Sequence, residues 1–194
     1  IGIPAGETIE TVFPDGKVDL SLRERNPESS LEELQRRVVF EVDQFCTEYE
    51  DKIRQMGGIG FFLGGIGPDG HIGFNARGSN LHSPTRLTYT NYETEAAAAS
   101  DLGGIEVSRH KPVITIGLGT MTYKPDAVVL IFAAGDAKSK VVRDAVHCDR
   151  DVLYPASALH GMPNARFYLT HGATVRLEER RLDDIAKAEK IDTE

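Results

Sequence analysis

The sequence is poor in cysteine and has no long apolar run, and both absences narrow the class of protein. Only 2 cysteines, Cys46 and Cys148, occur among 194 residues. They lack the C-x-x-C spacing of a zinc ribbon, so we expect neither a disulfide framework nor a metal site. This usage is typical of a reduced cytoplasmic protein. No apolar run approaches the ~20 residues of a membrane-spanning helix, and no signal-peptide pattern is present, so we expect no membrane partner.

Positive charge is the scarcer sign in this chain. It carries 22 Lys and Arg against 30 Asp and Glu, which gives a net charge of -8. Because proteins bind nucleic acid largely through Lys and Arg contacts to phosphate, this balance argues against nucleic acid as a partner. A small anionic substrate remains compatible with it, since a few well-placed donors can overcome an unfavourable net charge.

The length and a hydrophobic content of 40% suit one globular domain with a sizeable core. Apolar runs alternate with helix-like stretches, an order that predicts an α/β fold with a mainly parallel sheet. The expected strands are 59–63, 113–116, 127–133 and 166–169, and the expected helices are 94–102, 136–147, 157–159 and a charged amphipathic one at 178–190. The first 28 residues mix Gly, Pro and charge, and we expect loops and a short strand there.

The longest helix is expected to begin near Ser30 and to end at the pair Gly57-Gly58. Ser30 and Glu33 have the spacing of a capping box, and glycine is typical of the position just past a helix C-terminus. Apolar residues recur through this segment with helical spacing, which predicts a face packed in the core. They are Leu31, Leu34, Val38, Val42, Phe45, Tyr49, Ile53 and Met56.

The glycine-dense loop at 63–75 is the strongest functional signal in the sequence. An apolar run stops there, and the loop brings a carboxylate, Asp69, and an imidazole, His71, two residues apart. Glycine lets the backbone take positive φ and approach a ligand closely. Histidine titrates near neutral pH, and a nearby carboxylate can fix its tautomer and raise its basicity. The pattern predicts a site in which Asp69 and His71 work as a pair.

Two other interpretations of this loop have to be weighed. The stretch from Gly65 to Gly70 matches the dinucleotide fingerprint G-x-G-x-x-G, which requires a helix that starts inside the loop. Pro68 and the residues after it do not have a helical pattern, and no acidic residue closes a second strand at the expected distance. The other alternative is a plain turn, in which Asp69 caps backbone amides and His71 lies in a pocket wall or in solvent.

The wider sequence favours a site, because residues 57–75 resemble the central motif of the glucosamine-6-phosphate deaminases, G-G-V/I-G-x-D-G-H-I-x-F-N. The likeness continues through 85–86, 114–120 and 135–138 and covers roughly residues 45–175. The related 6-phosphogluconolactonases carry the same Asp-Gly-His but usually continue Thr-Ala-Ser. The resemblance implies a Rossmann-like three-layer sandwich, with a partial deaminase-type domain at 29–194 after an irregular segment at 1–28.

Enzymes of this family open the ring of glucosamine 6-phosphate, isomerise it through an enolamine and release ammonia to give fructose 6-phosphate. The resemblance implies that His71 is the ring-opening acid/base and that Asp69 orients it. It also implies that Gly65 and Gly73 line the sugar through their backbones. We therefore expect a deaminase/isomerase-like hydrolase of the cytoplasm that takes a sugar phosphate without cofactor or metal, with a homo-oligomer left open.

The resemblance assigns two further anion contacts. Lys138 matches a lysine that binds the substrate phosphate, and the predicted helix start at Gly135 supports this, because a helix N-terminus favours an anion. The alternative for Lys138 is a solvated surface lysine. Ser79 and Arg86 match positions that bind an allosteric sugar phosphate in some members, although the lysine that accompanies them is Thr88 here. A surface ion pair is the alternative for Arg86.

The chain also departs from the family pattern. A glutamate that completes the carboxylate–histidine arrangement is Ala76 here, and a phosphate-clamping arginine aligns with Ser100, for which Arg77 or Arg109 could substitute. Neither the family's glycine-rich phosphate turn nor its proton-moving aspartate is found near the start, which lacks a methionine and suggests a fragment. The alternatives to a deaminase are thus a non-catalytic sugar-phosphate-binding or regulatory module and a 6-phosphogluconolactonase-like hydrolase.

Overall fold

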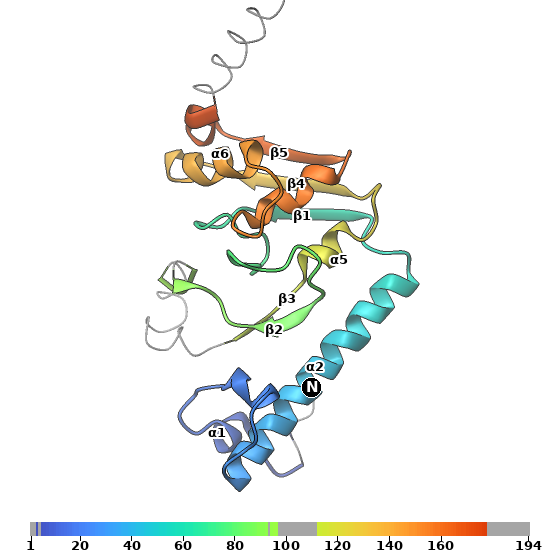
Figure 1. Cartoon of the computed structure of the whole chain (residues 1–194), viewed down its shortest axis with the longest axis vertical. Helices are drawn as coiled ribbons and strands as arrows, with labels where there is room; N and C mark the ends of the chain where they lie inside the picture. Colours follow the sequence, from blue (N-terminus) through green and yellow to red (C-terminus); the bar gives the residue numbers. More distant parts are fainter. Residues whose placement is uncertain (1–2, 4, 93, 97–111, 178–194) are drawn as a thin grey trace, which may run out of the picture.

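The computed structural model describes residues 3, 5–92, 94–96 and 112–177, which form an α/β fold (Figure 1). The labelled helices are α1 (Ile9–Val12), α2 (Ser30–Gln55), α5 (Leu118–Thr122) and α6 (Ser139–His147), and residues 171–177 are helical as well. The 3-10 helices are η1 (Leu20–Arg23), η2 (Asp136–Lys138) and η3 (Pro155–Gly161). The strands are β1 (Phe61–Gly65), β2 (Arg86–Thr88), β3 (Val113–Thr115), β4 (Val128–Ala133) and β5 (Ala165–Leu169).

Strands β1, β4 and β5 form a parallel sheet in that order, with Leu63 opposite Leu130 and Leu130 opposite Arg166. The predicted α/β fold with a parallel sheet is confirmed. Strand β3 occurs where it was expected, but it pairs antiparallel with β2, Ile114 lying opposite Leu87, and so belongs to a separate ribbon. Strand β2 was not predicted, because three residues are too few to show a period of two.

One face of the parallel sheet carries the core. Along β4, Val129, Ile131 and Ala133 are buried and alternate with residues that are exposed or half-buried. Their side chains pack with Leu118 of α5, Val142 of α6 and the buried residues of η3. Because side chains alternate across a strand, α5, α6 and η3 must all cover the same face.

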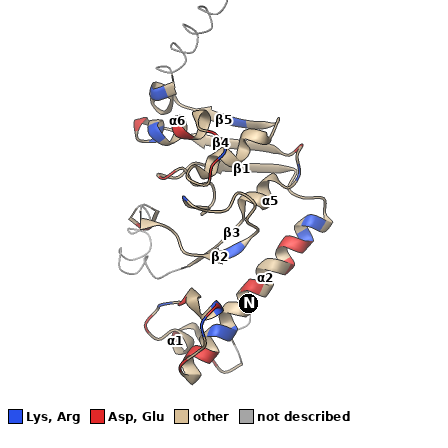
Figure 2. Ribbon diagram, viewed as in Figure 1, with Lys and Arg blue, Asp and Glu red and all other residues tan. Residues whose placement is uncertain are grey.

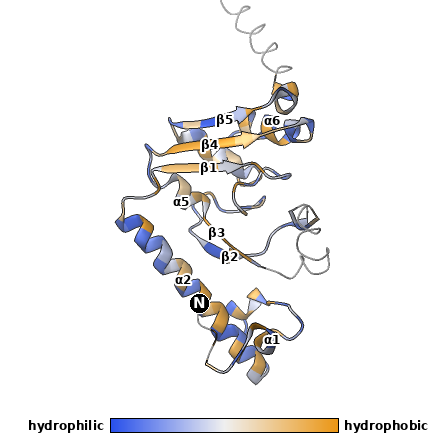
Figure 3. Ribbon diagram, turned by 180° about the vertical axis from the view of Figure 1, so that it is seen from behind, coloured by the Kyte–Doolittle hydropathy of each residue, from blue (hydrophilic) through white to orange (hydrophobic). Residues whose placement is uncertain are grey.

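The opposite face of the sheet is apolar and exposed. Phe61, Leu63, Phe132 and Tyr168 are 58%, 58%, 48% and 51% exposed, and the rings of Phe132 and Tyr168 stack at 5.2 Å. Seen from behind, the hydrophobic strands β1 and β4 lie in front of the helices (Figure 3). Parallel sheets normally have both faces covered. Of the predicted three-layer sandwich, the part of the chain described here contains the sheet and one helical layer.

Helix α2 begins where the sequence predicted, but a different serine caps it. Ser29, with φ -149° and ψ 163°, accepts a hydrogen bond from the Glu32 amide at 3.1 Å. The expected Ser30–Glu33 box is therefore wrong by one residue, because Ser30 already has helical geometry and cannot turn its hydroxyl back to the first amides.

The expected core stripe of α2 is buried only in part. Val38 and Ile53 are buried, whereas the exposed members are Leu31, Phe45, Tyr49 and Met56, at 39%, 43%, 44% and 77%. In Figure 1, α2 extends as an arm from α1 toward the parallel sheet, and the described elements that it contacts most, η1, β2 and α1, cover only part of its surface. Figure 2 shows acidic and basic residues along the same helix. The prediction that the whole stripe lies in the core is wrong.

A buried carboxylate attaches α2 to the rest of the fold. Glu50 is 6% exposed and accepts hydrogen bonds from the Thr85 amide at 3.1 Å and the Thr120 hydroxyl at 2.8 Å. Burying a carboxylate is costly unless such donors satisfy it. Glu50 thus links α2 to the residues before β2 and to the first turn of α5, and Arg86 follows Thr85 directly.

The remaining sequence predictions have mixed outcomes. The segment at 1–28 contains α1 and η1 and, among its described residues, no strand, so the expected strand is wrong; its division from 29–194 stays a prediction. The helices expected at 136–147 and 157–159 occur as η2 with α6 and as η3. Residues 94–96 are helical, and both 97–102 and 178–190 lie outside the described residues. No described helix combines the length and apolarity needed to cross a membrane.

Candidate active site

The loops after β1 and β4 meet at one edge of the parallel sheet. Parallel neighbouring strands bring their carboxyl ends to the same edge, which is where α/β sheets bind ligands. Gly65 ends β1, and the loop that follows carries Asp69 and His71. From the loop after β4, the Nζ of Lys138 donates a hydrogen bond to the carbonyl of Ile66 at 2.8 Å. The fold therefore brings Lys138 to the loop of His71, although the two residues are 67 positions apart in the sequence.

The loop closes on itself through its glycines. The Gly67 amide donates to the His71 carbonyl at 2.9 Å, and the Gly70 amide donates to the Gly67 carbonyl at 3.1 Å. Gly70 has φ +89°, in the left-handed region that favours glycine. A Cβ on Gly67 would lie 2.0 Å from Cε1 of His71. The imidazole thus packs directly on the Gly67 backbone, and sequence reasoning did not single out this glycine.

Asp69 and His71 form the pair that the sequence predicted. Nδ1 of His71 lies 2.5 Å from Oδ1 of Asp69, and their side chains are 12% and 2% exposed. Burial alone would raise the pKa of the Asp69 carboxyl. The hydrogen bonds from His71, the Arg77 amide (3.2 Å) and the Asn91 side chain (2.6 Å) outweigh burial and hold that pKa below its usual value. The carboxylate is ionised and its accepting positions are occupied.

The far end of the loop is fastened to β3. Gly73 has φ +61°, and a Cβ there would meet the Thr115 hydroxyl at 3.0 Å. That hydroxyl accepts the Phe74 amide at 2.9 Å. Asn75 is fully buried and donates from Nδ2 to the carbonyls of Ile72 at 2.9 Å and Ile116 at 2.8 Å. Gly73 therefore shapes the loop, and its predicted contact with a sugar stays a prediction.

Lys138 lies where a helix starts, as expected. It ends η2 and directly precedes α6. Desolvation lowers the pKa of its ammonium group, and the nearby Asp69 carboxylate opposes that shift. A half-buried ammonium bound to a loop carbonyl is not the solvated surface lysine of the alternative interpretation.

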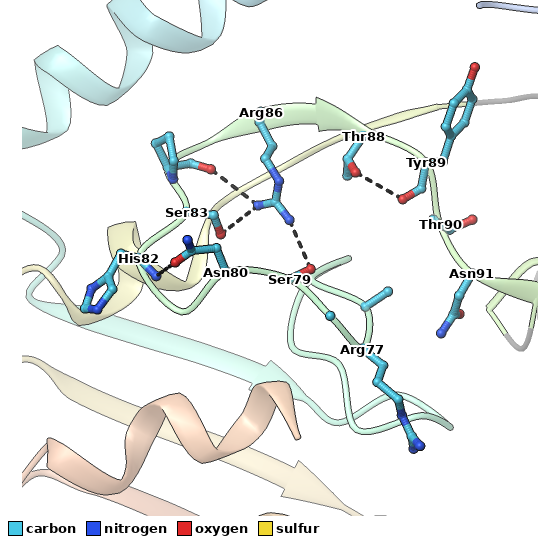
Figure 4. Close-up of a pocket in the computed structure, with 13 residues that line it drawn as sticks. Arg77, Ser79, Asn80, His82, Ser83, Arg86, Thr88, Tyr89, Thr90 and Asn91 are labelled. Carbon is cyan, nitrogen blue, oxygen red and sulfur yellow. Dashed lines mark hydrogen bonds between the residues drawn. The ribbon is translucent and has the colours of Figure 1, made fainter. Parts of the chain in front are cut away.

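Ser79 and Arg86 lie together in an open pocket of about 640 Å³ (Figure 4). The Arg86 guanidinium donates to the hydroxyls of Ser79 at 3.1 Å and Ser83 at 2.9 Å and to the Asn75 side-chain oxygen at 2.8 Å. These partners are neutral, so the alternative of a surface ion pair is not what the structure shows. Burial lowers the pKa of Arg86. Thr88 lines the same pocket.

The positions that depart from the family pattern can be placed in part. Ala76 and Arg77 line the Arg86 pocket, and the side chain of Arg77 points away from Arg86 in Figure 4. Ser100 and Arg109 lie outside the described residues. Among the described residues, no group of three or more His, Cys, Asp or Glu side chains is placed to hold a metal ion.

Comparison with known proteins agrees with this geometry, although no family model matches the chain. Over 133 residues, 69% of this chain, it is 37% identical to glucosamine-6-phosphate deaminases of Caenorhabditis elegans and Borrelia hermsii, each matched over 49% of its own length. A glucosamine-6-phosphate deaminase of Cronobacter sakazakii is 32% identical over 142 residues, 73% of this chain and 53% of that relative. The chain spans about half the length of these curated relatives.

A solved structure extends the comparison to the fold. A monomeric glucosamine-6-phosphate deaminase, described as a missing link of the NagB superfamily, matches with a TM-score of 0.61 and 28% identity over 78% of this chain and 56% of its own. The parallel sheet with its loop at the carboxyl edge is thus that of the NagB superfamily. Within it, the chain is similar in sequence to the glucosamine-6-phosphate deaminases, as a divergent relative.

Proposed function

We propose that the sheet edge holds the sugar-phosphate site of a glucosamine-6-phosphate deaminase, which converts glucosamine 6-phosphate and water to fructose 6-phosphate and ammonia. The observation that carries this proposal is the buried Asp69–His71 pair, with Nδ1 and Oδ1 2.5 Å apart, beside a lysine that the fold fastens to the same loop. His71 moves a proton between the ring oxygen and the anomeric hydroxyl. The Asp69 carboxylate stabilises the charged imidazole that forms in this step.

In the same proposal, Lys138 binds the phosphate, and Gly65 and Gly73 line the sugar with their backbones. A half-desolvated ammonium gains from an anion more than a solvated one does, because the local dielectric is lower. Ser79 and Arg86 form a second anion-binding pocket. The predicted cytoplasmic location belongs to this proposal as well, as does the open possibility of a homo-oligomer.

Turnover of glucosamine 6-phosphate by this chain tests the proposal. We expect ammonia and fructose 6-phosphate in equal amounts, a loss of rate of about 10²-fold or more in His71→Ala, and no loss in His171→Ala, a matched exposed histidine. Turnover that survives in His71→Ala would contradict the assigned role of His71.

A second candidate function is sugar-phosphate binding without turnover. Ala76 favours it, because an alanine cannot supply the second carboxylate of the family arrangement. This function predicts that glucosamine 6-phosphate raises the melting temperature while no product forms, since a ligand in excess of its dissociation constant must stabilise the fold. An unchanged melting temperature at millimolar ligand would exclude both functions for this chain.

A further inference from the structure

The hydrogen-bond network around His71 extends to two residues that the proposed function does not use. Asn91 and Thr94 lie at the start of the short helical stretch after β2, and both side chains reach the Asp69–His71 pair. Neither residue belongs to the glycine loop.

The orientation of the Asn91 amide follows from its partners. Nδ2 of Asn91 lies 2.6 Å from Oδ2 of Asp69, an ionised carboxylate that can only accept. Oδ1 of Asn91 lies 3.1 Å from the Thr94 amide, which can only donate. Exchanging the two ends of the amide would put donor against donor and acceptor against acceptor, so the orientation is determined from both sides.

The donors and acceptors around Thr94 likewise determine where its hydroxyl proton points. Its hydroxyl donates to Oδ1 of Asn91 at 2.7 Å, and a hydroxyl has a single proton to give. Toward Nδ1 of His71, at 3.2 Å, the Thr94 oxygen can therefore only accept. The Asp69 carboxylate can likewise only accept from Nδ1. Two independent neighbours thus require the proton of the neutral imidazole to be on Nδ1.

We propose that Asn91 and Thr94 are positioning residues that, with Asp69, hold His71 as its Nδ1–H tautomer and leave Nε2 as the atom that accepts and returns a proton. The assignment of Nε2 as the reacting atom rests on the proposed function, whereas the tautomer does not. The four side chains form a closed ring of hydrogen bonds, in which the single Nδ1 proton of His71 faces two acceptors, the Asp69 carboxylate at 2.5 Å and the Thr94 oxygen at 3.2 Å. Asn91 occupies the second oxygen of Asp69 without adding charge to the site.

This arrangement accounts for the departure at Ala76. The family pattern has a glutamate at that position to complete the support of the histidine, and Ala76 has no polar atom to offer. Asn91 and Thr94 provide neutral support from a different segment of the chain. Glycine at position 67 leaves room for the ring, because a Cβ there would be 2.2 Å from Nε2.

The experiment is a two-bond ¹H–¹⁵N correlation spectrum of the imidazoles in the full chain, at a pH where His71 is neutral. The His71 signals are identified by their loss in His71→Gln. We expect a proton-bearing Nδ1 and an unprotonated Nε2. Finding the proton on Nε2 would overturn the proposed tautomer. Absence of deaminase turnover would leave this result unchanged, so the two proposals fail separately.

Exchange of the Nδ1 proton with water tests the positioning role. We expect exchange about tenfold faster in Asn91→Ala and in Thr94→Val, as for the loss of one hydrogen bond. Thr94→Ser keeps the hydroxyl and is expected to behave as wild type. Should Asn91→Ala fail to fold, the Thr94 pair decides, because valine matches threonine in shape. Unchanged exchange in Thr94→Val would show that Asn91 and Thr94 merely pack beside the site.

Discussion

Arg86 donates a hydrogen bond from Nη1 to the side-chain oxygen of Asn75 at 2.8 Å. This contact joins the open pocket that contains Ser79 to the loop that carries His71, because Asn75 is fully buried in the closure of that loop. An anion that bound Arg86 would therefore contact a side chain that is itself hydrogen-bonded to the His71 loop, through Asn75.

Arg86→Ala is therefore expected to destabilise the fold by about 1–3 kcal/mol, the cost of leaving the buried Asn75 oxygen without its partner. The free energy of unfolding in urea measures this loss. Arg166→Ala is the matched control, since Arg166 is exposed and its guanidinium donates to the carbonyls of Pro163 and Ala165 beside it. Equal effects of the two substitutions would contradict the link.

Gly67→Ala is expected to displace the His71 ring, because the new methyl group would overlap it at 2.0 Å. We expect changed chemical shifts of the His71 imidazole together with a fall in stability of about 1–3 kcal/mol from overpacking. Gly161→Ala is the control, since nothing lies within 4 Å of a Cβ at that position. A Gly67→Ala protein with an unperturbed His71 spectrum would contradict the close packing.

The Asp69 carboxyl is expected to make the free energy of unfolding depend on pH in the acid range. Its pKa in the folded chain lies below the ordinary value of 3.8, so its contribution is present above about pH 4 and is lost as the pH falls toward the folded-state pKa. Urea denaturation between pH 6 and pH 3 should show a steeper loss of stability for the wild type than for Asp69→Asn. Asp126→Asn, at an exposed carboxylate, should keep the wild-type slope. Equal slopes for wild type and Asp69→Asn would contradict this role.

The exposed face of the parallel sheet predicts self-association. Exposed apolar patches of this kind mark interaction surfaces or aggregation sites. Phe132→Glu is expected to shift the chain toward monomer in size-exclusion chromatography with light scattering, without unfolding it, because Phe132 is 48% exposed. Ile131→Glu, on the covered face of the same strand, should unfold the protein. A wild-type chain that is monomeric throughout the micromolar range would refute the prediction.

Features that depend on neighbouring residues could be predicted from the sequence. Apolar runs predicted β1, β4 and β5, and the glycine-dense loop predicted the Asp69–His71 pair, because each signal lies within a few residues of what it specifies. The partners of the loop could not be predicted in this way. Thr115 and Thr94 lie 41 and 23 residues from the atoms they contact, and such contacts exist only once the chain has folded.

Helix α2 shows a different limit. The helical spacing of apolar residues identified its apolar face. That spacing does not show whether another element packs on the face, and Phe45 and Tyr49 are exposed. The serine cap was misplaced by one residue for a related reason. Two adjacent serines are equivalent in composition, and only the extended backbone of Ser29 distinguishes them.

The most direct measurement of the central claim is a titration of the chain with glucosamine 6-phosphate, followed by the amide NMR signals of residues 65–75. The account predicts saturable shifts in this loop and affinity at least about tenfold weaker in Lys138→Ala, the loss of one charge-assisted contact. Lys140→Ala, an exposed lysine in the next helix, should bind as wild type. Equal affinity in Lys138→Ala and wild type, or no shift at residues 65–75, would contradict a sugar-phosphate site at this edge of the sheet.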